Sequence, residues 1–112
     1  MIVNNNILVS DLTCSSPLQL KFWNDKDWNN NNFKTFVADN LEKCMDFCLG
    51  DNRCKAFTFD RQNQLAGANC WLKKTGENFK DHSGHTSGVR CNHENTPQLP
   101  PSGKYPVTGL PK

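Results

Sequence analysis

The sequence lacks the features that mark several large classes of protein. No apolar run approaches the ~18 residues that a membrane-spanning helix needs, so we expect no membrane insertion. The net charge of the 112 residues is only +2, which predicts no general attraction to nucleic acid. Neither a glycine-rich phosphate loop nor a CxxC pair occurs in the chain. These absences argue against a membrane-spanning, nucleotide-binding or nucleic-acid-binding protein.

Apolar residues are also scarce, whereas cysteine is plentiful. Hydrophobic residues make up 36% of the chain, so a single domain of this length has a thin core and benefits from covalent support. An even number of cysteines in a short chain indicates a disulfide framework formed in an oxidising compartment. Metal binding and redox chemistry are the weaker alternatives, because the close spacings are CxxxC and CxxxxxC. The six cysteines are Cys14, Cys44, Cys48, Cys54, Cys70 and Cys91.

The first half of the chain contains one clear helix signal. Leu41 to Leu49 places apolar residues and two cysteines on one face, Asn40 can cap its first turn, and Gly50 is expected in the left-handed conformation at its end. Before it, alternation around Leu20 and Phe22 indicates a strand. Residues 24–32 look like a polar loop that contains Trp28, and residues 33–40 contain another short strand.

The second half alternates between short strands and polar loops. CKAFTFD (residues 54–60) and CWLKK (residues 70–74) are typical of strands. The segments between them and after them, including residues 75–85, are expected to be loops. Residues 1–13 are a lead-in with a possible strand, residues 14–91 the domain, and residues 92–112 a proline-rich linker or tail without a packed core.

The order of these motifs is similar to that of a known family. NLEKCMDFCLGDNRCKAFTFD, CWLKK and SGVRC combine a CxxxC helix, a third cysteine six residues later, an aromatic strand, a strand that opens with cysteine and a small-residue strand. This arrangement resembles the PAN/apple domain family, in its apple-type variant with six cysteines. The resemblance covers about residues 14–91 and implies an α+β fold, with one helix packed on an antiparallel β-sheet.

The resemblance also implies a disulfide pairing and a class of function. Six cysteines allow fifteen pairings, and their spacing alone selects none of them. The family pattern implies Cys14–Cys91, Cys44–Cys70 and Cys48–Cys54. Members of the family are extracellular binding modules, so we expect a secreted, non-enzymatic domain within a larger multi-domain chain, with no cofactor.

Two sets of residues are candidates for catalysis or metal binding. Asp25 and Asp27 form a carboxylate pair, but two carboxylates in a polar loop are normally solvated. His82 and His85 form an HxxH motif, and two histidines without a third ligand are a weak metal signal. We therefore expect neither a catalytic site nor a metal site.

A binding site is the stronger prediction. Trp28 lies among short polar side chains, which is typical of sugar sites where a ring stacks on the sugar and carboxylates and amides bind its hydroxyls. The expected ligand-binding residues are Asp25, Asp27, Trp28 and Asn30, and the expected function is carbohydrate recognition. A Trp28 ring packed in the core is equally compatible with the sequence. The alternative function, protein–protein adhesion, predicts a wider apolar patch rimmed by Arg or Lys.

Overall fold

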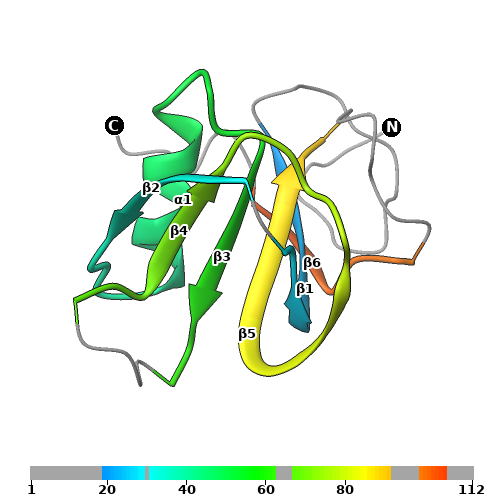
Figure 1. The fold of residues 1–112 in the computed structure, drawn as a ribbon. Helices are drawn as coiled ribbons and strands as arrows, with labels where there is room; N and C mark the ends of the chain where they lie inside the picture. Colours follow the sequence, from blue (N-terminus) through cyan, green and yellow to red (C-terminus); the bar gives the residue numbers. More distant parts are fainter. Residues whose placement is uncertain (1–18, 30, 63–66, 92–98, 106–112) are drawn as a thin grey trace.

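The computed structural model describes residues 19–29, 31–62, 67–91 and 99–105. Within these residues one helix packs on a six-stranded antiparallel sheet of strand order β2-β4-β3-β5-β1-β6, as Figure 1 shows. The α+β class predicted from the sequence is confirmed. The elements are β1 (Leu20–Asp27), β2 (Asn32–Phe36), α1 (Leu41–Leu49), β3 (Ala56–Asp60), β4 (Cys70–Lys73), β5 (Lys80–Arg90) and β6 (Gly103–Tyr105).

Helix α1 has the bounds that the sequence predicts. The side chain of Asn40 accepts a hydrogen bond from the Lys43 N–H at 2.9 Å, which satisfies one of the free amides of the first turn. Gly50 differs from expectation, because its φ of −82° is right-handed; its N–H donates to the carbonyl of Asp46, and the N–H of Asp51 donates to that of Cys48. The helix therefore ends without a left-handed residue.

Two disulfides fasten α1 to its surroundings. Cys44–Cys70 joins the helix to β4, and Cys48–Cys54 joins its last turn to the turn before β3. Both pairings are confirmed. Cys91 is also disulfide-bonded; its expected partner, Cys14, lies outside the described residues.

The main core lies between α1 and the sheet. Phe57 and Phe59 of β3 and Leu72 of β4 are buried there against the helix and its disulfides. Arg90 closes the helix end: its guanidinium donates to the carbonyls of Cys48 and Cys54, at 3.1 and 2.7 Å. A buried arginine thus links the last turn of the helix to the turn before β3.

A second cluster packs on the opposite face of the sheet. Trp23 and Trp28 are buried with Val89, and Phe79 packs against both indole rings. The indole N–H of Trp28 donates to the carbonyl of Gly88 at 2.9 Å. Trp28 therefore belongs to the core.

Two segments expected to be loops are strands instead. β1 continues to Asp27, so residues 24–27 are not part of a loop, and β5 begins at Lys80, five residues before the predicted loop ends. β1 and β5 pair with one another, and this long-range pairing overrides the polar composition of both segments.

The proline-rich segment also contributes to the sheet. β6 pairs with β1 in antiparallel register from Leu20 opposite Tyr105 to Phe22 opposite Gly103. Residues 103–105 therefore have a packed partner, contrary to the expectation for residues 92–112. The lead-in at residues 1–13 lies outside the described residues, and the domain bounds stay a prediction.

None of the helices in the described part of the chain is long and apolar enough to cross a membrane.

Candidate functional site

The most irregular place in the sheet lies where β1 pairs with β5. Asn24 stands opposite Thr86 and Lys26 opposite Asp81, so residues 82–85 of β5 face only Asp25 of β1. Extra residues of this kind form a β-bulge, which changes the direction of side chains and is frequent beside functional sites. We refer to residues 82–85 as the β5 bulge.

Asp25 holds the β5 bulge in place. Its carboxylate accepts hydrogen bonds from the Gly84 N–H at 3.0 Å and from the Arg61 guanidinium. These two bonds, the backbone one first, lower the pKa of Asp25. Asp25 itself has a φ of 62° and Gly84 one of 89°, a region that glycine adopts without steric cost. Asp25 therefore stabilises the backbone of the β5 bulge through its bond to Gly84.

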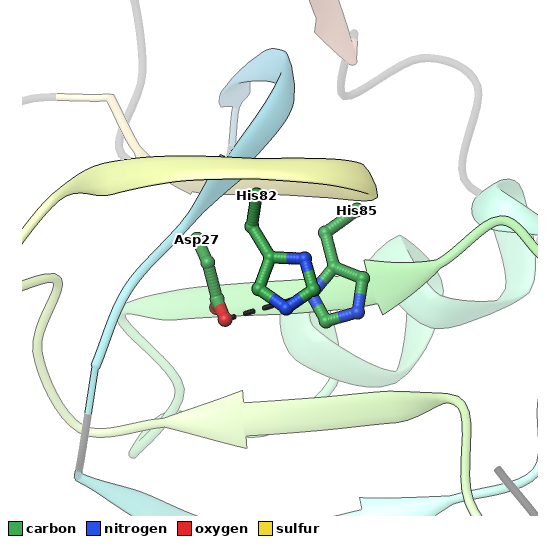
Figure 2. Close-up of side chains that lie close together, drawn as sticks. All are labelled: Asp27, His82 and His85. Atoms are coloured by element: carbon green, nitrogen blue, oxygen red, sulfur yellow. Dashed lines mark ion pairs between the residues drawn. The ribbon is translucent and has the colours of Figure 1, made fainter. Parts of the chain in front are cut away.

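The β5 bulge turns two histidines toward the end of β1. His82 and His85 are three residues apart, a spacing that would place them on opposite faces of a regular strand. Here their rings stack at 3.7 Å between centroids and 12° between planes. Figure 2 shows both rings beside the carboxylate of Asp27, whose Oδ2 lies 3.5 Å from Nδ1 of His85. One donor atom from each of the three side chains lies within 4.8 Å of the others.

Buried polar groups fix the carboxylate of Asp27. Thr58 donates to its Oδ1 at 2.9 Å and contacts the hydroxyl of Ser87 at 2.7 Å. Thr58 and Ser87 stand opposite one another on β3 and β5 and are both buried. The position of Asp27 is therefore set by two neighbouring strands in addition to its own.

His85 is the inner and more constrained of the two histidines. Its ring stacks on Trp71 of β4 at 5.8 Å, and its Nδ1 is buried without a hydrogen-bond partner among the described residues. Burial, and then the charge of the neighbouring His82, lower the pKa of His85. Both effects favour the neutral imidazole, which is the form that binds metal ions.

The expected sugar-binding residues do not come together as a surface site. Trp28 is only 2% exposed, so the prediction of a solvent-facing stacking ring is wrong and the core interpretation of this residue holds. Asp25 supports the β5 bulge, Asp27 joins the histidines, and Asn30 lies outside the described residues. The sequence signal for Asp27 and the HxxH motif was present, but the strand pairing that unites them was not visible.

A different surface gathers exposed apolar side chains. Phe36 at the end of β2 stacks on Phe47 of α1 at 4.1 Å between ring centroids. Phe47 is 36% exposed, and Val37, which follows Phe36, is 64% exposed. The Arg53 guanidinium lies 4.6 Å from the centre of the Phe33 ring, and the Lys34 ammonium 5.7 Å from that of Phe36. The α1–β2 surface is defined as Phe33, Lys34, Phe36, Val37, Phe47 and Arg53.

Comparison with known proteins shows which family the sequence matches. Residues 26–73, which run from the end of β1 through β4, match the family described as PAN domain. Residues 26–73 are therefore assigned to the PAN domain family. PAN domains are generally non-enzymatic modules that bind proteins or carbohydrates, and with their disulfides they are typical of extracellular proteins.

A similar protein among the curated ones is an uncharacterized protein of Acanthamoeba polyphaga mimivirus. The two are 29% identical over 66 residues, which cover 58% of this chain and 18% of the viral protein. The chain thus spans less than a fifth of that relative. No solved structure matches the sequence.

Proposed function

We propose that this PAN domain is a protein-binding module of a secreted multi-domain protein, and that the α1–β2 surface is where its partner binds. The observation that supports this most is the grouping of apolar side chains there. Val37 and Phe47 are two of the three large apolar residues that are exposed in the described part of the chain; Phe47 stacks on the Phe36 ring, and Val37 follows Phe36 in the chain. Scattered exposed apolar residues need no explanation, whereas a contiguous group is typical of interaction sites.

The composition of the surface fits a protein partner. Aromatic residues and arginine are enriched among residues that dominate binding energy, usually at the centre of a patch with polar groups around it. In this domain the Phe36–Phe47 stack is the centre, and Arg53 and Lys34 cover aromatic rings at its margin. Because Arg53 is paired with Asp51, Lys34 is the cation that can attract a carboxylate of the partner beside the apolar contact.

Carbohydrate recognition has less support. It was predicted from an exposed Trp28 with polar neighbours, and Trp28 is in the core. Phe47, an exposed aromatic residue in the described part of the chain, stacks on another aromatic ring, that of Phe36. A protein partner therefore accounts for more of the exposed residues than a sugar does.

The test compares matched variants of the disulfide-bonded domain. The immobilised domain is exposed to extracellular protein mixtures and to a glycan array, and bound proteins are quantified by mass spectrometry. Val37→Ser, Phe47→Ser and their combination remove apolar contacts from the α1–β2 surface. Leu99→Ser is the control, because Leu99 is the third exposed apolar residue, at 47%, and is not part of that surface.

The expected result is a partner that binds to the wild type and to Leu99→Ser but not to the double variant. Thermal denaturation establishes that all variants remain folded. Two outcomes contradict the proposal: a protein partner that the double variant retains, or a glycan that the wild type and the double variant bind equally in the absence of any such protein.

A further inference from the structure

Three potential ligands meet at the β5 bulge, away from the α1–β2 surface. Asp27 is the last residue of β1, and His82 and His85 come from the bulge itself. The donor atoms of these side chains all lie within 4.8 Å of one another. In the sequence, the HxxH motif has no evident third ligand. The pairing of β1 with β5 supplies that ligand from 55 residues earlier in the chain.

The distances suit a small ion. Zinc–nitrogen bonds of ~2.0–2.1 Å place neighbouring ligands of a tetrahedral site roughly 3.3 Å apart. Asp27 Oδ2 and His85 Nδ1 are 3.5 Å apart. His82 is exposed, so its ring can rotate to complete the set without disturbing the core.

The groups around the three ligands already have the arrangement of an outer coordination shell. In metal sites the second ring nitrogen of a ligating histidine usually donates to a carbonyl, and ligating carboxylates are themselves hydrogen-bonded. Nδ1 of His82 lies 3.3 Å from the carbonyl oxygen of Ser83, which leaves Nε2 for a ligand. Thr58 holds the other oxygen of Asp27. Nδ1 of His85 is buried without a hydrogen-bond partner among the described residues, and a metal ion would satisfy it.

We propose that Asp27, His82 and His85 bind a divalent transition-metal ion, for which Zn²⁺ is the best match. Two imidazole nitrogens and one carboxylate oxygen suit zinc, whereas calcium and magnesium prefer oxygen ligands alone. Three protein ligands leave the fourth tetrahedral position to water. The proposal is independent of the partner that the α1–β2 surface binds.

The test is a titration of the disulfide-bonded, chelator-treated domain with ZnCl₂ by isothermal titration calorimetry. A thiol assay first establishes that no free cysteine competes for zinc. The wild type is expected to bind one equivalent of Zn²⁺. His82→Gln should weaken binding at least ~10-fold, because loss of a direct ligand exceeds the usual effect of losing an outer-shell group. His82 is exposed, so this variant keeps the fold.

Asp81→Asn is the matched control. Asp81 precedes His82, is exposed and pairs with Lys26, but is not one of the three ligands. It should bind Zn²⁺ as the wild type does. Histidine ¹⁵N spectra provide a second measurement: Zn²⁺ should shift ring nitrogens of both His82 and His85.

Three results would each overturn the proposal. They are the absence of saturable Zn²⁺ binding to the wild type, equal affinity in wild type and His82→Gln, and zinc-induced shifts confined to His93, the third histidine of the sequence.

Discussion

The two faces of the sheet are built on different principles. On the helix side, apolar residues such as Phe57 and Leu72 are sealed under α1, and two disulfides fix the helix to the strands. On the other face, hydroxyl, carboxylate and imidazole groups meet around Thr58, beside the tryptophan cluster. Successive residues of β3 alternate between these faces. One strand can therefore serve as scaffold on one side and hold a polar site on the other.

Among the substitutions that compare the two faces, Phe57→Ala should cause the largest loss of stability. Phe57 is fully buried on the helix side, and truncating a buried phenylalanine costs ~3–5 kcal/mol because a cavity remains. Urea denaturation of the variant gives the free energy of unfolding. A loss below about 1 kcal/mol would contradict the assignment of this face as the main core.

The two disulfides on the helix side should differ in how much they stabilise the folded domain. Cys44–Cys70 closes a separation of 26 residues and Cys48–Cys54 one of 6. In the chain-entropy account these closures stabilise by about 3.5 and 2 kcal/mol, respectively. Denaturation of the paired variants, Cys44→Ala with Cys70→Ala and Cys48→Ala with Cys54→Ala, should give this order. The reverse order would mean that native-state contacts rather than loop length decide the difference.

Thr58→Val tests the opposite face at the position next to Phe57. The change keeps the side chain's shape but removes the hydroxyl that binds Asp27 and Ser87. Leaving such partners unsatisfied costs ~1–3 kcal/mol. The measurement is again urea denaturation, and the expected loss is smaller than that of Phe57→Ala. A variant as stable as the wild type would show that the polar row does not contribute to stability.

Gly84→Ala and Gly67→Ala separate backbone strain from the role of the β5 bulge. Both glycines have a positive φ, near 89° and 87°, where a side chain costs roughly 1–2 kcal/mol. A Cβ at Gly67 meets no atom within 4 Å, whereas one at Gly84 would lie 2.8 Å from the Gln62 side chain. Both variants should lose similar stability by denaturation, but only Gly84→Ala should alter the NMR signals of His82 and His85. Unaltered signals would show that the bulge does not depend on Gly84.

The sequence predicted the helix side of the molecule well. Cysteine spacing, the Asn40 cap and the period of α1 are local signals, and the family pattern supplied the Cys44–Cys70 and Cys48–Cys54 pairings. Gly50 was the exception, since its N–H bond to Asp46 is made with right-handed geometry.

The opposite face was predicted poorly because its structure depends on distant pairing. Asn, Asp, His, Gly and Ser are typical of loops, yet residues 24–27 are held in a strand by pairing with Lys80, Asp81 and Thr86 of β5. Polar neighbours also concealed the burial of Trp28. The β5 bulge follows from the register of two strands about 60 residues apart, and no local pattern gives that register.

The most direct test of this account is whether the β5 bulge brings the two histidines together. A nuclear Overhauser experiment on the disulfide-bonded, metal-free domain can detect contact between the ring protons of His82 and His85. The account predicts a strong cross-peak between the two rings, and a further one from His85 to Trp71, because the rings stack in the structure. A regular β5 would place His82 and His85 on opposite faces of the sheet. Absence of the cross-peak between the histidines, in a domain that otherwise shows the β1–β5 pairing, would contradict the account.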